Sequence, residues 1–237
     1  QGMMDEEQER LSMKQQFGWL NDMLDSLPVQ TMIYDGIEAD DTIAYITKHT
    51  QHDLDGEVVI VSTDKDFLQL VSDKVSVFSP TKKKMYNRQV VFDEFGIWPE
   101  NLLLYRTLDG DKSDNIPGIK GCGVKTLLKR FPELSEDRTI THEEFFKMCE
   151  EKQGKIKMYD DILKAKDQLL MNKRLMELDN PHIPTNQKLQ ILDRFNVDDI
   201  EFKKLDFLRV GQKYKVLQNW RDINDWLHST FHNIITK

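Results

Sequence analysis

The sequence contains few cysteines and no long apolar run. Its 237 residues include two cysteines, Cys122 and Cys149, which form neither a Cys-x-x-Cys pair nor a zinc-binding pattern with the six histidines. This usage excludes a disulfide-stapled domain or a zinc finger, and it fits a reducing, cytoplasmic compartment. No stretch of about 18 apolar residues is present, and nothing resembling a secretory signal follows Gln1. We therefore expect a globular protein with no membrane partner.

Basic residues are scarce at the start of the chain. The formal net charge is −8, and residues 1–60 hold 3 basic and 13 acidic side chains, whereas the remainder holds 30 and 28. An acidic total argues against a nonspecific binder of nucleic acid. The clustering of the acids weakens that argument, because clustered carboxylates can be neutralised by bound metal ions.

Hydrophobic spacing predicts an α/β region followed by helices. Strands are expected at residues 29–34, 58–62 and 75–79. Helices are expected at residues 13–27, 40–49, 67–71, 99–108 and 124–131. Beyond Pro132 the strand pattern stops, and residues 142–178 and 186–235 have helical spacing. The predicted fold class is therefore α/β, with a parallel or mixed central sheet, flanking helices and a helical C-terminal region.

Three acidic clusters lie along the predicted sheet region. They contain, in order, Glu38, Asp40 and Asp41; Asp64 and Asp66; and Asp111 and Asp114. Each cluster alone has a structural explanation: the acids of the first two can cap the helices that follow, and the third can be a polar turn. Two of the clusters, however, directly follow predicted strands, and the carboxyl ends of parallel strands meet at one edge of a sheet. We therefore expect the seven carboxylates to converge.

Converging carboxylates indicate a particular chemistry. Oxygen ligands without histidine or cysteine suit Mg²⁺ or Mn²⁺ rather than zinc. Two such ions about 3.5–4 Å apart clamp a phosphodiester, one activating water and the other stabilising the departing oxygen. Metal-dependent phosphodiester hydrolysis is the leading prediction.

A glycine-rich segment precedes the predicted helix 124–131. Gly118, Gly121 and Gly123 allow a tight turn and a close approach of backbone N–H groups to a phosphate. Lys120, Lys125 and Lys129 flank or follow this turn, away from the apolar face of the helix. The pattern favours sequence-independent binding of a DNA backbone. The alternative is an ordinary helix with a solvated basic face.

The motifs IEADD, VSTDKDFLQL and LDGDKSDNIPGIKGCGVKTLLKRF resemble those of the 5′-nuclease family. This family comprises the flap endonucleases and 5′→3′ exonucleases of bacteria and bacteriophages, and the 5′-nuclease domain of DNA polymerase I. The strong resemblance covers residues 33–131, and a weaker one, including MNKRLMELDNPHIP, extends to residue 184. It implies a PIN-like core with a helix–two-turn–helix motif, and a structure-specific 5′-nuclease that removes flaps or RNA primers in replication and repair.

The resemblance also implies site residues and cofactors. The catalytic and metal-binding residues would be Glu38, Asp40, Asp41, Asp64, Asp66, Asp111 and Asp114. The DNA-binding residues would be Gly118, Lys120, Gly121, Gly123, Lys125, Thr126 and Lys129. The implied cofactors are two Mg²⁺ ions, replaceable by Mn²⁺, and K⁺ at the helix–two-turn–helix motif. The implied partners are flapped DNA, RNA/DNA primer junctions and replication proteins such as a polymerase, clamp or single-strand-binding protein.

The resemblance also predicts a domain layout for the chain. Residues 1–27 match the far side of the family's helical arch and the following helix, residues 28–115 the metal-binding core, residues 116–184 the DNA-binding region and residues 185–237 a C-terminal helical region packing on the core. The family's first acidic strand and most of its arch find no counterpart in this sequence, so we expect the chain to bind branched DNA but to cut it slowly. We also expect a monomer that acts in a bacterial or phage-infected cytoplasm. Two other functions remain open: a PIN-like ribonuclease and a noncatalytic module that binds DNA junctions.

Overall fold

The computed structural model describes residues 5–195 and 201–235 and contains two compact units. One unit is formed by residues 35–185. The other combines residues 1–34 with residues 186–237. Every residue of the predicted acidic clusters and of the glycine-rich segment belongs to the first unit.

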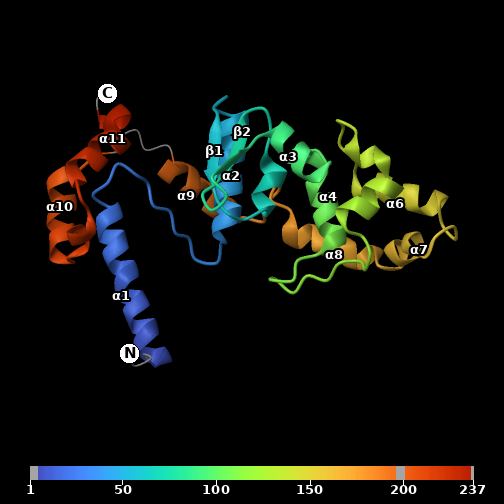
Figure 1. Cartoon of the computed structure of the whole chain (residues 1–237), viewed down its shortest axis with the longest axis horizontal. Helices are drawn as coiled ribbons and strands as arrows, with labels where there is room; N and C mark the ends of the chain where they lie inside the picture. The colour runs from blue at the N-terminus through green and yellow to red at the C-terminus, as the bar shows by residue number, and fades with distance from the viewer. Residues whose placement is uncertain (1–4, 196–200, 236–237) are drawn as a thin grey trace. The chain divides into compact units, whose positions relative to one another are not determined.

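A small mixed sheet organises the first unit (Figure 1). Strand β1 (Val58–Val61) pairs in parallel with β2 (Val75–Ser79), which pairs antiparallel with β3 (Lys84–Tyr86). Alternation along β1 buries Ile60, whereas the outward side chains Val59 and Val61 are exposed. The strands are rich in valine, as expected for a sheet buried on one face.

Helices cover the sheet and continue from it. The elements that pack with the strands are α2 (Ala39–His52), the 3₁₀ turn η1 (Asp66–Leu70), α3 (Arg88–Phe95) and α4 (Pro99–Asp109). Pro99 begins α4 at a position where its missing N–H costs no hydrogen bond, and Gly96 ends α3 with a φ of 67°. The turn after β1 leads into η1, which packs against α4.

A second apolar core lies among the later helices of this unit. They are α5 (Val124–Arg130), the 3₁₀ turn η2 (Pro132–Ser135), α6 (His142–Glu151), α7 (Lys157–Lys164) and α8 (Lys166–Met176). Helix α8 packs against α4 (Figure 1). Leu127, Phe131 and Phe145 are fully buried, as are the free thiols of Cys122 and Cys149.

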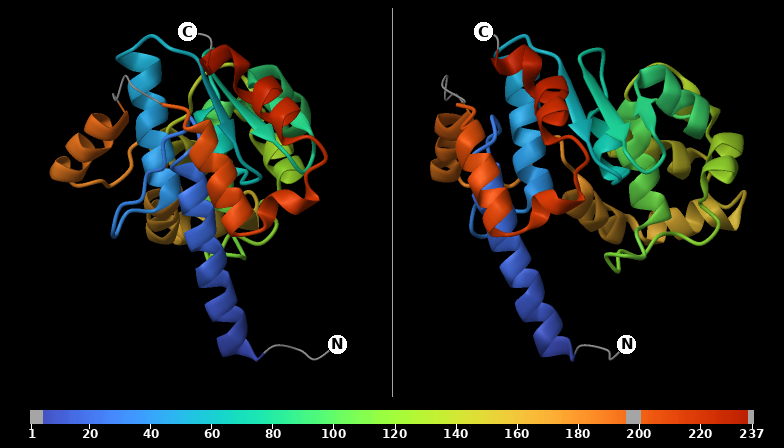
Figure 2. Two further views of the ribbon diagram at one scale, coloured as in Figure 1. Left: turned by 90° about the vertical axis from the view of Figure 1, so that its left-hand side faces the viewer. Right: turned by 60° about the vertical axis from the view of Figure 1, so that its left-hand side comes forward.

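The other unit is helical in its described part. It contains α1 (Glu6–Leu24), α9 (Thr185–Phe195), α10 (Lys204–Lys213), the 3₁₀ turn η3 (Val216–Asn219) and α11 (Ile223–Ile235). Its core is aromatic: Phe207, Leu227 and Phe231 are buried. The ring of Trp19 on α1 stacks on Tyr214 at the end of α10, 5.1 Å between centroids, and Figure 2 shows these two helices side by side.

Most predicted elements are confirmed with small shifts of their ends, although the first helix begins seven residues earlier than predicted, at Glu6. The strands at residues 58–62 and 75–79 form, and the helices at residues 13–27, 40–49, 99–108 and 124–131 correspond to α1, α2, α4 and α5. The segment 67–71 is a 3₁₀ turn rather than an α-helix. Residues 196–200 of the predicted helical region lie outside the described residues. No helix in the described part combines the length and apolar composition that crossing a membrane requires.

The predicted strand at residues 29–34 is wrong. A strand needs a neighbour to accept and donate its backbone hydrogen bonds, and within the described residues this segment joins no sheet. Its side chains are accordingly accessible, with Ile33 75% exposed. The first acidic cluster therefore does not follow a strand, and the sheet is mixed rather than fully parallel.

Candidate metal centre and nucleic-acid interface

Five of the seven predicted carboxylates line one hollow of about 440 Å³. They come from all three clusters, and we refer to this feature as the acidic hollow. Its lining consists of Glu38, Asp40, Asp64, Asp66, Asp114, Ile116, Leu175, Met176 and Leu178. Asp41 and Asp111 are the two predicted residues outside this lining. The expected convergence is therefore confirmed for five side chains.

The first cluster enters the hollow from the start of α2. Glu38 is the N-cap residue of this helix, but its carboxylate makes no capping hydrogen bond. Asp40 accepts a hydrogen bond from the backbone N–H of Asp41 at 2.9 Å. Helix capping therefore does not explain the presence of the Glu38 carboxylate at this position.

The second cluster follows β1 in a tight turn. The Ser62 hydroxyl accepts from the N–H of Asp64 at 3.1 Å, and the Asp64 carboxylate accepts from the N–H of Asp66 at 2.9 Å. These bonds set Asp64 and Asp66 at the carboxyl end of the strand, as predicted. Asp66 also begins η1.

The third cluster is carried on a closed loop. Asp111 and Ile116 exchange both backbone hydrogen bonds, at 2.8 and 2.7 Å, so that residues 112–115 form the tip. Asn115 has a φ of 57° there, a conformation that asparagine tolerates better than most residues. Asp114 reaches the hollow, whereas the Asp111 carboxylate accepts from the N–H and hydroxyl of Ser113.

A basic residue that the sequence interpretation missed joins two clusters. Arg106 on α4 donates from Nε to Asp66 Oδ1 at 2.9 Å and from Nη2 to Asp111 Oδ2 at 2.6 Å. The side chains of Arg106, Asp66 and Asp111 are 19%, 20% and 17% exposed. The signal in the sequence was an arginine near the end of a predicted helix, one turn before an acidic loop.

The electrostatics of the carboxylates differ from one to the next. Burial raises the pKa of Asp66, and the charge and hydrogen bond of Arg106 offset this only partly. Hydrogen bonding from the Ser113 hydroxyl, followed by Arg106, lowers the pKa of Asp111 to about 2. Burial, then the charges of Asp40 and Glu38, raise the pKa of Asp41. The raised pKa values of Asp66 and Asp41 therefore come first from burial and second from neighbouring carboxylate charges.

The donor set suits a divalent cation in its chemistry but not in its present arrangement. The lining offers carboxylate oxygens and no imidazole or thiol, the set that hard cations prefer. Among the residues that the structure describes, however, no three Asp, Glu, His or Cys side chains lie close enough together to hold an ion. Arg106 is bonded to two of the carboxylates instead.

The glycine-rich segment, residues 118–123, is continuous with the wall of the hollow. Ile116 lines the hollow, and Gly118 follows two residues later. A Cβ at Gly118 would collide with the carbonyl group of Asp109, whereas a Cβ at Gly121 or Gly123 would meet no atom within 4 Å. Gly123 has an ordinary φ of −64°. Packing within the chain therefore explains glycine at position 118 and leaves it unexplained at position 123.

The predicted DNA-binding side chains form an accessible basic surface. Lys120, Lys125, Thr126 and Lys129 are all exposed, while Leu127 on the opposite face of α5 is fully buried. The predicted division of this helix into an apolar and a basic face is confirmed. The binding role of these residues stays a prediction.

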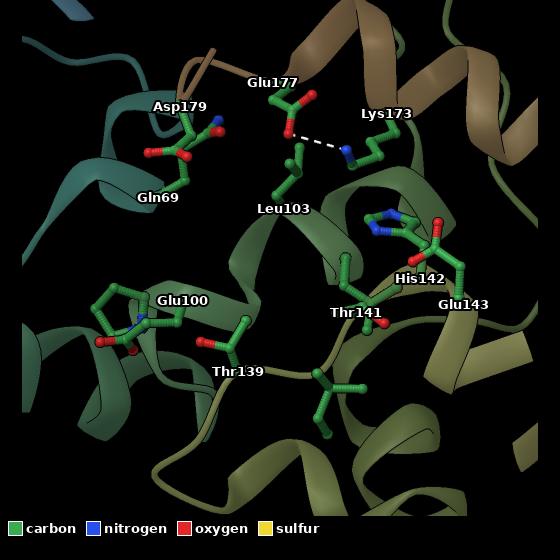
Figure 3. A pocket seen from close by; sticks show the side chains of 13 residues that line it. Gln69, Glu100, Leu103, Thr139, Thr141, His142, Glu143, Lys173, Glu177 and Asp179 are labelled. Atoms are coloured by element: carbon green, nitrogen blue, oxygen red, sulfur yellow. Dashed lines mark ion pairs between the residues drawn. The ribbon is translucent and has the colours of Figure 1, made fainter. Parts of the chain in front are cut away.

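A second hollow, of about 390 Å³, lies between α4, α6 and the end of α8 (Figure 3). Figure 3 shows Lys173 and Glu177 facing each other there, and their charged groups are 2.9 Å apart. Burial lowers the pKa of His142 to about 4, and its Nε2 lies 3.2 Å from the Thr107 hydroxyl. No predicted site residue lines this hollow.

Comparison with known proteins shows similarity to 5′-3′ exonucleases and to DNA polymerase I. Residues 6–96 match the family model described as the 5′-3′ exonuclease N-terminal resolvase-like domain. The chain is 44% identical over 100 residues to a 5′-3′ exonuclease of Aquifex aeolicus, covering 40% of this chain and 34% of that one. It is 33% identical over 170 residues to DNA polymerase I of Bacillus subtilis, covering 69% of this chain and 18% of that one.

Solved structures agree with these sequence matches. A flap endonuclease of bacteriophage T5, solved with DNA and metal ions, aligns with a TM-score of 0.54 at 25% identity, over 77% of this chain and 62% of that one. A T5 protein crystallised with metal ions shares the fold, with a TM-score of 0.60 at 24% identity over 89% and 74% of the two chains. The chain spans about a third of the Aquifex exonuclease and a smaller part of the polymerase. Its three motifs, its matched relatives and its fold agree in their similarity to the 5′-nucleases.

Proposed function

We propose that this chain is a structure-specific 5′-nuclease, acting as a 5′-flap endonuclease and 5′→3′ exonuclease on branched DNA. The observation that carries the proposal is the acidic hollow. Carboxylates separated by more than 70 residues of sequence line one hollow, and an exposed glycine- and lysine-rich segment starts at its wall. A purely structural role explains the separate clusters but not their gathering.

The proposed cofactors are divalent metal ions, with Mg²⁺ as the natural ion and Mn²⁺ as a substitute. The relatives solved with metal ions support this choice, as does a donor set made of carboxylates. We propose Glu38, Asp40, Asp41, Asp64, Asp66, Asp111 and Asp114 as the residues that hold them. K⁺ at residues 118–123 is part of the same proposal.

In this proposal the basic surface binds the nucleic acid. Lys120, Lys125 and Lys129 neutralise backbone phosphates, which fixes the duplex without reading its sequence. Gly121 and Gly123 leave the backbone open to a phosphate, because no atom of the chain occupies the place of a side chain there. Flapped DNA and primer junctions are the proposed substrates, encountered beside a polymerase, clamp or single-strand-binding protein.

One observation favours a second candidate, a noncatalytic module that binds DNA junctions. The carboxylates of the described residues do not gather tightly enough to hold an ion, and Arg106 neutralises two of them. Such a module needs the basic surface alone. It predicts junction binding that is independent of metal ions and survives the loss of Asp66.

A cleavage assay on a 5′-labelled flap duplex separates the two candidates. We expect cutting near the junction in Mg²⁺ or Mn²⁺, none in EDTA and none with Asp66→Asn. Asp167→Asn is the matched control, since Asp167 is an exposed carboxylate on α8 outside the hollow. Tight junction binding without cutting in either metal would contradict the nuclease proposal and favour the binding module.

A further inference from the structure

A single arginine beside the acidic hollow, Arg106, pairs with carboxylates of two of the acidic clusters. Among the ion pairs of the described residues, Arg106 is the one lysine or arginine that contacts any of the seven predicted carboxylates. It contacts two of them, and they belong to different clusters. The arginine therefore joins the turn after β1 to the loop after α4.

Arg106 makes three short contacts with the carboxylates of Asp66 and Asp111. Nε and Nη2 both lie 2.9 Å from Asp66 Oδ1, and Nη2 also lies 2.6 Å from Asp111 Oδ2. Burial disfavours the charge of the guanidinium, yet the two carboxylates outweigh burial and raise the pKa of Arg106. Charge-assisted hydrogen bonds of this length are the stronger kind.

Arg106 bonds the two carboxylates that an ion shared between these clusters would also need. A cation held jointly by Asp66 and Asp111 takes electron pairs from both carboxylates, and Arg106 already takes one oxygen of each. Two positive charges side by side in a partly buried site would repel each other. Simultaneous occupation is therefore disfavoured.

We propose that Arg106 is a built-in counter-cation that competes with a divalent metal ion for Asp66 and Asp111, so that it sets the affinity of the site for metal. This inference rests on the proposed function, which makes the two carboxylates metal ligands. When an ion binds, the guanidinium leaves Asp66 and Asp111. Arg106 is thus a positioning residue, holding like-charged clusters together until the ion replaces it.

Binding of Mn²⁺ to the full chain, followed by electron paramagnetic resonance of the free ion at pH 7.5, tests the inference without any cleavage step. Arg106→Gln removes the competing charge, so we expect roughly tenfold tighter Mn²⁺ binding. Arg106→Lys keeps the charge and should stay within about threefold of the parent chain. Arg88→Gln is the matched control, because Arg88 pairs with Asp73, Glu100 and Asp137 away from the hollow, and its Mn²⁺ affinity should not change.

Thermal unfolding gives a second readout. In EDTA, Arg106→Gln should melt at a lower temperature than the parent chain, since Asp66 and Asp111 lose their counter-charge. Saturating Mn²⁺ should raise the melting temperature of this variant by more than it raises that of the parent. Arg88→Gln should lose stability equally with and without the ion.

A third measurement uses the parent chain and so does not depend on folding of the variant. The Nε–H resonance of Arg106, assigned by its loss in Arg106→Lys, should report a hydrogen-bonded guanidinium in EDTA and a released one after Mg²⁺ is added. An unchanged resonance at saturating Mg²⁺ would overturn the inference. Equal or weaker Mn²⁺ binding by Arg106→Gln would overturn it as well, while leaving the proposed function standing. A parent chain that binds no Mn²⁺ would instead refute the metal-dependent function and this inference with it.

Discussion

The side-chain amide of Asn172 on α8 donates a hydrogen bond to the backbone carbonyl of Pro117 over 2.9 Å. The same amide nitrogen lies 3.0 Å from the Thr107 carbonyl in the last turn of α4. Asn172 is 2% exposed, so its side-chain amide has little access to water as an alternative partner. One buried side chain therefore ties the loop that carries Asp111 and Asp114 to two helices.

Replacing Asn172 tests the importance of these two hydrogen bonds. Asn172→Leu, which has similar volume, should lower the free energy of unfolding by about 2–3 kcal/mol, because the Thr107 carbonyl loses its buried donor and the Pro117 carbonyl keeps only Gln168. Urea denaturation measures the change. Gln168→Leu is the control, since exposed Gln168 donates to the same Pro117 carbonyl at 2.9 Å and should cost less than about 1 kcal/mol. Equal losses in the two variants would contradict the role assigned to Asn172.

His142 makes stability depend on pH in a definite direction. Burial first, and then the charge of Lys173, lower its pKa from 6.5 to about 4. The unfolded chain therefore takes up a proton at a higher pH than the folded chain does. The stabilisation is complete above pH 6.5 and is lost as the pH falls toward 4, by about 3 kcal/mol in total.

The measurement is the free energy of unfolding at a series of pH values between 7 and 4. His142→Gln keeps an amide donor for the Thr107 hydroxyl but does not titrate, so its curve should be flatter than that of the parent chain over this range. Parallel curves for the two proteins would show that another group is responsible.

Glycines 118 and 123 should respond differently to substitution. Gly118→Ala meets the carbonyl group of Asp109 and should destabilise the fold by about 1–3 kcal/mol. Gly123→Ala meets nothing within the chain, so its unfolding should match that of the parent. If a phosphate approaches the backbone there, Gly123→Ala should nevertheless weaken duplex binding several-fold. Normal folding with undiminished binding would remove Gly123 from the proposed DNA interface.

The two lysines of α5 should act through charge alone. Lys125→Gln and Lys129→Gln should each weaken binding to any duplex sequence and reduce the slope of log affinity against log salt by about 1. Fluorescence anisotropy between 50 and 200 mM salt measures the slope. Lys147→Gln is the matched control, because Lys147 is exposed on α6, outside the basic surface. A slope that changes equally in all three variants would argue against a defined interface.

The sequence predicted those features that depend on local chemistry. Alternating and β-branched residues marked β1 and β2, Pro99 marked the start of α4, and three-residue spacings separated the apolar and basic faces of α5. The position of the second acidic cluster was also predictable, since the turn after β1 has to lie at the sheet edge. The first cluster lines the same hollow although the strand expected before it does not form.

The features that the sequence did not reveal depend on partners far away along the chain. Residues 29–34 have the composition of a strand, but a strand exists only with a neighbour, and composition carries no information about that neighbour. Arg106 and Asp66 are 40 residues apart, and the periodicity of α4 describes Arg106 only as a polar position near a helix end. In the sequence, Asn172 likewise has no feature that distinguishes it from other helix residues, and its hydrogen bond to the Pro117 carbonyl is known only from the structure.

The burial of both thiols has a practical consequence for spectroscopy. Burial raises the pKa of Cys122 to about 11 and that of Cys149 to about 12, so both remain protonated at neutral pH. Thiol-directed dyes react with the thiolate, and neither group presents one to solvent. A cysteine introduced at an exposed position such as Lys147 can therefore carry a fluorophore or spin label selectively, with the native cysteines left in place.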